Sequence, residues 1–399
     1  MIQSEVAFRP VSRSAKPQSD GLLGAVLLAV KGYATPETGR AYARARDLCE
    51  QLGYPTEFLH VPYGQSVHHA LRGELDLALQ LDEDLLRLSR QRNDSGGLVL
   101  GHTSSGRNLM FAGRFASSRS HLEEVLALYD PSVHRSLVQQ AGIHPHVNSR
   151  AILARVLFCL GYPDQALALN NAAIAEARTL AHTPSLAVTL TFGASLLSLN
   201  GDNAVLGEWV DQLVTVTTEQ SFPPFGTQGT IYRGWFKVIS GDVAEGISLL
   251  RSGSAAYRAT GQEGWMPHFI ALIAAACGIA GQIEDALALL DEALQIVERT
   301  RERWLEAELY RHKGELLLRQ GHAEAAEELY RKALSIAQEQ EAKLWELRAA
   351  ASLARLRRDQ GRSAEARDLL APVYGWFTEG FDTPDLKEAK ALLDELRGG

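Results

Sequence analysis

The sequence is poor in cysteine, in basic charge and in long apolar runs. Its 399 residues include three widely separated cysteines, Cys49, Cys159 and Cys277, with neither metal-ligand spacing nor a disulfide framework. Lysine and arginine number 40 against 48 acidic residues, a net charge of −8, which argues against nucleic acid as a partner. The apolar run 22–30 is far shorter than the roughly 20 residues that span a bilayer, so no membrane association is expected.

The sequence also has little that would indicate a secretory signal or β-strands. Residues 1–20 are polar, carry two prolines and lack the apolar stretch of a secretory signal, so we expect a disordered lead and a cytoplasmic protein. No alternating run of apolar and polar residues is bounded by hairpin turns. Helix-like patterns fill the remainder: "AEAAEELYRKALSIAQEQ" places apolar residues at i, i+3, i+4 and i+7.

Small residues recur with a period of 40 residues. Glycines stand at 161, 201, 241, 281, 321 and 361. The residue seven before each glycine is always alanine or glycine, namely Ala154, Ala194, Gly234, Ala274, Gly314 and Ala354. A glycine that ends a helix in the left-handed conformation, with a small residue two turns earlier, is typical of two closely packed antiparallel helices. The period therefore predicts an array of helical hairpins.

The same spacing extends towards the N-terminus. Gly73 and Gly113 continue the 40-residue step, and Gly32 lies 41 residues before Gly73. The step from Gly113 to Gly161 is 48 residues, so we place an insertion at about residues 129–147, where prolines break helices. The expected organisation is one solenoid of nine helix pairs over residues 21–396, with turns near 32, 73, 113, 161, 201, 241, 281, 321 and 361.

The pattern resembles the tetratricopeptide repeat (TPR). The eighth unit carries it best, with Trp304, Leu309, Gly314, Leu317, Gly321, Ala326, Tyr330 and Ala333 at the small and large positions of that motif. The period of 40 exceeds the usual 34, and the proline that often closes a TPR is mostly missing. The resemblance implies an all-α, right-handed TPR-like superhelix.

Several phrases resemble a narrower group, the TPR-rich C-terminal region of large bacterial signalling ATPases, some of which carry class III nucleotide cyclase domains. They include "GYPDQALALNNAAIA" and "KGYATPETGRAYARARDLCEQLG". The resemblance implies a non-catalytic interaction scaffold or regulatory module without a cofactor. Its partner would be a protein or peptide, with an ATPase or nucleotide cyclase as one candidate. Neither of those domains is present in this sequence, so their activities do not carry over.

The stretch "GGLVLGHTSSGRNLMFAG", residues 96–113, raises the question of a phosphate-binding loop. It has the G-x-x-x-x-G spacing, but Arg107 and Asn108 stand where that motif needs lysine and a hydroxyl residue. Gly106 lies seven residues before Gly113, the same offset as the small residues of the other repeats. We therefore predict that Gly106 lies inside a helix and faces another helix.

Two alternative functions stay open. One is an enzyme with a site near "GIHPHV", residues 142–147, although two histidines without further ligands make a weak metal site and an exposed loop is the plainer interpretation. The other is a small-molecule sensor whose superhelix closes around a ligand near Tyr232, Trp235 and Trp265. Trp265, Trp304 and Trp345 recur at 39 and 41 residues, which favours packing between repeats.

The first helices of a solenoid line its concave face, so we expect partner contacts there. By TPR register, the groove residues are Asn148, Arg155, Gln228, Trp235, His268, Arg311, Glu315, Arg348, Arg355 and Arg358. The arginines near the C-terminal end would suit an acidic peptide or a C-terminal carboxylate, because arginine binds carboxylates with two hydrogen bonds. The alternative is that they balance acids on adjacent helices, such as Glu341 and Glu346.

Overall fold

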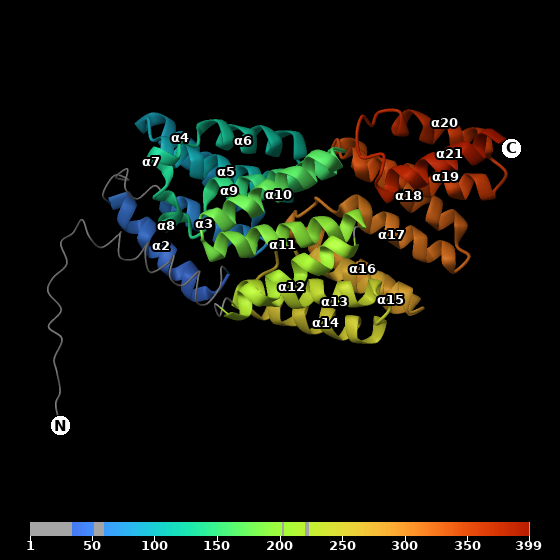
Figure 1. The fold of residues 1–399 in the computed structure, drawn as a ribbon, viewed down its shortest axis with the longest axis horizontal. Coiled ribbons are helices and arrows are strands. Elements are labelled where there is room, and N and C mark those ends of the chain that lie inside the picture. The colour runs from blue at the N-terminus through green and yellow to red at the C-terminus, as the bar shows by residue number, and fades with distance from the viewer. Residues whose placement is uncertain (1–33, 52–59, 202, 220–222, 399) are drawn as a thin grey trace, which may run out of the picture.

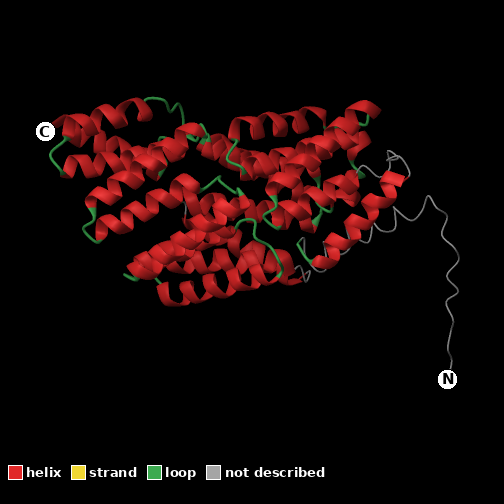
Figure 2. Ribbon diagram, turned by 180° about the vertical axis from the view of Figure 1, so that it is seen from behind, coloured by secondary structure: helices red, strands yellow, loops and turns green. Residues whose placement is uncertain are grey.

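The computed structural model describes residues 34–51, 60–201, 203–219 and 223–398, and every regular element in these ranges is a helix (Figures 1 and 2). The expected polar lead and the turn near residue 32 lie outside these ranges. The first helices of eight pairs are α3 (His60–Leu71), α5 (Ser95–Phe111), α9 (Pro145–Cys159), α11 (Thr183–Asn200), α13 (Pro223–Ile239), α15 (Met266–Ile279), α17 (Glu306–Arg319) and α19 (Lys343–Asp359). The second helices are α4 (Leu75–Arg92), α6 (Phe115–Leu128), α10 (Pro163–Thr179), α12 (Asn203–Glu219), α14 (Val243–Ala259), α16 (Ile283–Thr300), α18 (Ala323–Glu339) and α20 (Ser363–Tyr374).

A glycine with positive φ separates the two helices of each pair. Gly73, Gly113, Gly161, Gly201, Gly241, Gly281, Gly321 and Gly361 have φ between 73° and 99°. We number the pairs second to ninth by these glycines, and α2 (Pro36–Gln51) precedes them. An L-residue with a side chain rarely adopts this conformation, so the glycine ends the first helix and turns the chain back.

The small residue seven positions before the turn glycine allows the two helices of a pair to approach closely. A Cβ atom added to Gly106 would lie 2.5 Å from the side chain of Leu122 in α6, and one added to Gly314 would lie 2.7 Å from the ring of Tyr330 in α18. The prediction for Gly106 is confirmed: it lies inside α5 and faces α6. The spacing that suggested a phosphate loop is a helix-packing position.

The solenoid closes on itself after five pairs. The backbone N–H groups of Glu263 and Gly264, just before α15, donate to the carbonyl oxygen of Leu71 at the end of α3, at 2.8 and 3.0 Å. The contact recurs forty residues later, where the N–H groups of Arg303 and Trp304 donate to the carbonyl oxygen of Phe111, at 2.7 and 3.1 Å. The seventh and eighth pairs therefore lie against the second and third.

The same offset continues to the C-terminal end. The fourth turn lies beside Lys343 at the start of the ninth pair, and the guanidinium of Arg348 donates to the carbonyl oxygen of Leu199 near the fifth turn. In Figure 1 the C-terminal helices accordingly lie beside the ends of α9 and α10. The second to fifth turns are covered by this layer. Cβ atoms added to the turn glycines of the sixth to ninth pairs would meet nothing within 4 Å.

Two parts of the chain depart from the simple array. The last described helix, α21 (Pro384–Gly398), packs on α19 and α20 and covers the last pair. Repeat arrays require such a cap because the outermost pair has no neighbour against which to bury its apolar face. The other departure lies between α6 and α9, where two short helices occupy the expected insertion, α7 (Pro131–His134) and α8 (Leu137–Ala141).

Candidate functional site

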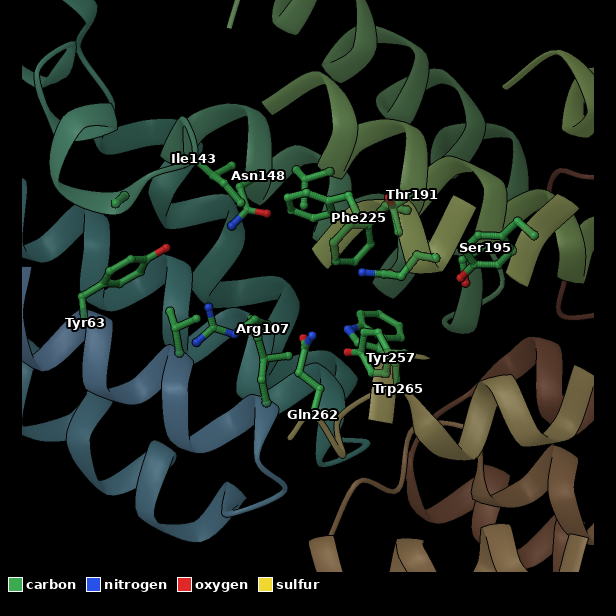
Figure 3. Close-up of a pocket in the computed structure, with 17 residues that line it drawn as sticks. Tyr63, Arg107, Ile143, Asn148, Thr191, Ser195, Phe225, Tyr257, Gln262 and Trp265 are labelled. Carbon is green, nitrogen blue, oxygen red and sulfur yellow. The ribbon is translucent and has the colours of Figure 1, made fainter. Parts of the chain in front are cut away.

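The closed superhelix encloses a cavity between its N-terminal pairs and the segment before α15 (Figure 3). Its volume is about 90 Å³, measured as the space open to the centre of a water molecule. One water needs about 10–15 Å³ on this measure, so the cavity has room for a small organic molecule. The aromatic part of its lining consists of Tyr63, Phe192, Phe225, Tyr232, Tyr257 and Trp265. The aliphatic part is Val67, Leu71, Ala141, Ile143 and Val188, and the polar part is Arg107, Asn148, Thr191, Ser195, Gln228 and Gln262.

The repeat places these side chains on one inner stripe of the first helices. Asn148, Val188 and Gln228 lie thirteen residues before their turn glycines. Arg107 and Ser195 lie six residues before theirs. Positions seven residues apart share one face of a helix, so successive first helices present both positions to the same concave side. The cavity is therefore lined mainly from α3, α5, α9, α11 and α13.

Trp265 forms the wall that belongs to the second layer. Its ring lies edge-on to those of Phe192 and Phe111, with centroids 5.4 and 4.9 Å away. Its backbone has φ 71°, the left-handed region that a bulky residue rarely enters. The buried carboxylate of Glu302 accepts hydrogen bonds from the backbone N–H of Trp265, at 3.0 and 3.1 Å, and from Nε1–H of Trp304, at 2.9 Å. Glu302 thereby holds the strained turn in place.

Burial raises the pKa of Glu302 to about 8, because the loss of water disfavours the charged carboxylate. The two tryptophan hydrogen bonds lower its pKa and the nearby carboxylate of Glu263 raises it, both by less than the burial does. This buried acid therefore links protonation to the turn that carries Trp265.

Arg107 supplies the charge of the cavity. Its side chain is nine-tenths buried, and its Nε donates to Oδ1 of Asn108 at 3.1 Å. Nδ2 of Asn108 in turn donates to the carboxylate of Asp82 at 2.7 Å and to Oγ of Ser66 at 2.9 Å, and Ser66 also donates to Asp82. Nη2 of Arg107 has no hydrogen-bond partner among the described residues. In Figure 3 Arg107 lies between Tyr63 and Gln262 at the edge of the open space.

Asp82 is buried behind Asn108. Among the described residues, it forms no direct salt bridge with Arg107. Burial raises its pKa to about 6, while the charge of Arg107 and the hydrogen bonds from Ser66 and Asn108 act in the opposite direction. Asn108 therefore separates the two charges and fixes the orientation of the guanidinium.

The structure divides the ten predicted groove residues between separate places. Asn148 and Gln228 line the cavity, while Arg155 and His268 are buried behind its wall. The guanidinium carbon of Arg155 lies 4.9 Å from the ring centroid of Trp304 and 5.6 Å from that of Trp265. Trp235 is half-buried against the apolar core and does not line the cavity.

The other five predicted residues lie at the C-terminal end of the array. Arg311, Glu315, Arg348 and Arg355 line a polar groove beside α21, and Arg358 lies one turn further along α19. Each of these arginines is already paired with a carboxylate of this chain. The pairs are Arg311 with Glu308 and Glu315, Arg348 with Glu308 and Asp385, Arg355 with Glu388, and Arg358 with Asp359 and Glu395.

The acids that balance these arginines differ from those expected. Glu346 pairs with Lys343, at 2.7 Å, and the acids of α17 and α21 take its expected role. The sequence did not indicate the acids of α21 because α21 was not foreseen as a separate helix across the face of α19, whereas Glu315 of α17 was among the predicted groove residues.

The expectation of an exposed loop at residues 142–147 is wrong. His144 is buried and its Nε2 lies 2.9 Å from the hydroxyl of Tyr129, while Nδ1 of His146 lies 2.8 Å from the carboxylate of Glu176. Pro145 begins α9, so both histidines belong to a helix start that packs on the next helix. Among the described residues, no group of three or more histidine, cysteine, aspartate or glutamate side chains could hold a metal ion.

Arg107 was not among the predicted groove residues, although the repeat register indicates it. Arg107 lies six residues before Gly113, the offset at which Arg155, Trp235 and Glu315 precede their own glycines. The same register therefore indicates Arg107 once the third pair is included. Tyr257, Gln262 and Trp265 reach the cavity only because the superhelix closes, which no local pattern reveals.

Comparisons with known proteins agree with the fold. Residues 268–339 match the tetratricopeptide repeat model. A Rap protein complexed with competence and sporulation factor superposes with a TM-score of 0.55 at 12% identity, over 86% of this chain and 98% of that chain. The Cut9–Hcn1 hetero-tetramer of the APC/C gives 0.53 at 12% identity, over 97% of this chain and 65% of that chain.

A relative in sequence is an uncharacterized protein of Rhizobium meliloti (strain 1021), 26% identical over 215 residues. The match covers 54% of this chain and 21% of that protein, so this chain corresponds to about a fifth of its relative's length. No helix within the described ranges is long and apolar enough to cross a membrane. The family match and the superpositions together show an all-α, TPR-like solenoid.

Proposed function

We propose that this chain is a non-catalytic, ligand-responsive interaction module. A ligand occupies the cavity, and the outer surface of the solenoid binds a protein partner. The observation that carries the proposal is the composition of the cavity wall: one segment, residues 262–265, both lines the cavity and donates the backbone hydrogen bonds that close the superhelix onto Leu71. A ligand there touches both layers at once, and so it favours the closed form.

The cavity chemistry supports binding over catalysis. Ser195 lines the cavity and its Oγ lies 3.1 Å from Nε2 of His268, the contact that a serine nucleophile and its base would make. However, burial holds the pKa of His268 well below its ordinary value, and the positive charge of Arg155 lowers it further. This position disfavours a general base, because the imidazolium would form beside a buried guanidinium.

The Rap structure supports a binding role, because a solenoid of similar shape forms a complex with competence and sporulation factor. Association of this chain with a signalling ATPase or nucleotide cyclase is a narrower proposal, which rests on the sequence resemblance alone. A cytoplasmic location is a further proposal, supported by the three free, buried thiols, which are in keeping with a reducing compartment.

The proposal is tested with aromatic probes and a blocked cavity. Phenylacetate, phenylacetamide and N-acetylphenylalanine amide are titrated into the wild type and into Val188→Phe, in which the larger side chain fills the space beside α11. Ser252→Phe on the exposed face of α14 is the matched control. The readout is calorimetric binding together with amide hydrogen exchange in residues 261–265.

We expect the probes to bind the wild type and the control and to slow amide exchange in that segment. In Val188→Phe we expect neither binding nor slower exchange. The slower exchange follows because the amides of Glu263 and Gly264 exchange only when the layers separate. Absence of binding by every probe at millimolar concentration, with unchanged exchange, would refute the proposal.

A further inference from the structure

We propose that the ligand of the cavity carries a carboxylate, which Arg107 binds, on an apolar or aromatic body. The inference rests on the proposed function, because it names the chemical class of the ligand for the same cavity. It starts from charge: among the described lining residues, Arg107 is the only one with a formal charge. The occupant therefore faces a single buried cation and no buried anion.

The guanidinium is held ready for an acceptor. Its Nε is fixed by Asn108, and Asn108 is fixed by Asp82 and Ser66, so the side chain cannot turn away without breaking a buried network. Nη2 is buried and has no hydrogen-bond partner among the described residues. A buried donor without an acceptor is unfavourable, and a ligand oxygen placed there removes that penalty.

The geometry around Arg107 favours an anion on its cavity side. Burial raises the pKa of Asp82 to about 6, so this acid still ionises at neutral pH, but it lies behind Asn108 and does not line the cavity. A carboxylate matches the planar fork of a guanidinium with two parallel hydrogen bonds. A phosphate dianion would bring a second negative charge that no other cation of the described lining could meet.

The remaining wall defines the body of the ligand. In Figure 3 Phe225 and Trp265 lie across the open space from Arg107, and Phe192 and several aliphatic side chains also line the cavity. The amides of Asn148 and Gln262 also line the cavity and could pair with a peptide group or a hydroxyl of the ligand. A free aromatic acid and the C-terminal residue of a peptide share this chemistry.

The experiment compares acids with their neutral amides. Phenylacetate and phenylacetamide represent the free acid, and the peptide Gly-Ala-Leu-Phe with a free or amidated C-terminus represents the peptide source. Dissociation constants are measured by calorimetry for the wild type, for Arg107→Gln and for Arg107→Lys. Arg87→Gln on the exposed face of α4 is the control for the loss of one positive charge.

In the wild type and in Arg87→Gln, the acids are expected to bind at least about tenfold more tightly than the amides, because a charge-assisted bond replaces a neutral one. In Arg107→Gln the preference falls to about one while the amides bind as before. Arg107→Lys, which retains the charge without the fork, keeps part of the preference. The acid preference is then compared between the phenylacetate pair and the peptide pair. The pair with the larger preference shows whether the ligand is a free acid or the C-terminus of a peptide.

Equal binding of acids and amides by the wild type would overturn the inference while leaving the proposed function in place. Tighter binding of phenyl phosphate than of phenylacetate would also overturn it, in favour of a phosphate ligand. Failure of all probes, neutral and charged, is the separate outcome that refutes the proposed function itself. The wild-type comparison decides the matter even where a substitution at Arg107 prevents folding.

Discussion

Closure of the superhelix makes the cavity, so the glycine that permits this closure is the sharpest test of the structure. Gly73 and Gly281 have the same φ of 78° and the same position in their pairs. They differ in surroundings: the second layer covers Gly73, while a Cβ added to Gly281 would meet nothing within 4 Å. Alanine at either position therefore introduces the same backbone strain, and only alanine at position 73 meets the other layer.

The expected magnitudes follow from this difference. A left-handed alanine costs about 1–2 kcal/mol, which applies to Gly73→Ala and Gly281→Ala alike. At position 73 the new Cβ would lie 2.5 Å from Cγ2 of Thr300, 3.2 Å from Cβ of Thr300 and 3.3 Å from Cβ of Glu263. Two of these atoms are bonded directly to the backbone, so relief requires the layers to move. Overpacking of this kind costs a further ~1–3 kcal/mol.

The assay is urea unfolding of the wild type and both variants, followed by circular dichroism, with amide hydrogen exchange for residues 261–265. An array of this length need not unfold in one step, so exchange in the interlayer segment is the more local measure. Gly73→Ala is expected to unfold at lower urea than Gly281→Ala and to speed exchange in that segment, which Gly281→Ala leaves unchanged.

A second variant sharpens the test. Thr300→Ser removes Cγ2, the atom nearest to the added Cβ, and retains the hydroxyl that donates to the carbonyl oxygen of Ile296. In the Gly73→Ala background it should restore part of the lost stability, whereas in the Gly281→Ala background it should not. Equal losses for the two alanine variants, or no rescue by Thr300→Ser, would show that the second and seventh pairs do not touch as described.

Three further predictions concern charge. The pKa of Glu302 is raised from the ordinary 4.5 to about 8, so this carboxyl favours the folded state most below pH 4.5 and loses that advantage as the pH rises to about 8. The stability of Glu302→Gln relative to the wild type should therefore increase by up to about 1.4 kcal/mol per pH unit between these values, measured by urea unfolding at a series of pH values; a flat difference would contradict the raised pKa. Arg348→Ala should cost about 3 kcal/mol or more because it takes a partner from the buried carboxylate of Glu308, while Arg355→Ala should cost under about 1 kcal/mol because its pair is exposed; similar thermal denaturation midpoints for the two variants would contradict this. Arg355→Glu tests partner capture, because it leaves the buried pair of Arg348 and Glu308 intact. If the C-terminal groove binds an acidic segment, this variant should no longer capture that partner.

The sequence was sufficient for the local architecture. The 40-residue step of Gly161 to Gly361 and the small residue seven positions earlier specify a helix, a left-handed turn and a second helix that packs closely on the first. These features involve contacts within one repeat, so a single repeat contains the information. The same reasoning placed Gly106 inside a helix and removed the phosphate-loop interpretation of its neighbours.

The sequence pattern identified only part of the candidate site. The register identified Asn148 and Gln228, because side chains at a fixed offset from the turn glycine share one concave face. The register also placed Trp235 in this group, but that side chain packs half-buried against the apolar core. It further predicted that the C-terminal arginines belong to the same groove, whereas they line a separate one. Their partners on α21 show how a single terminal helix changes which charges are available.

The tertiary structure decided what the repeat pattern leaves open. A small rotation from each pair to the next accumulates over the array, and no residue encodes the sum by itself. That sum brings Trp265 and Gln262 into one cavity with Arg107 and Asn148, which lie more than a hundred residues earlier. It also covers Gly73 while leaving Gly281 open. The sequence by itself determined the helix pairs and their inner faces. The closure of five pairs into one turn determined that those faces enclose a space, with Nη2 of Arg107 left without a hydrogen-bond partner at its edge.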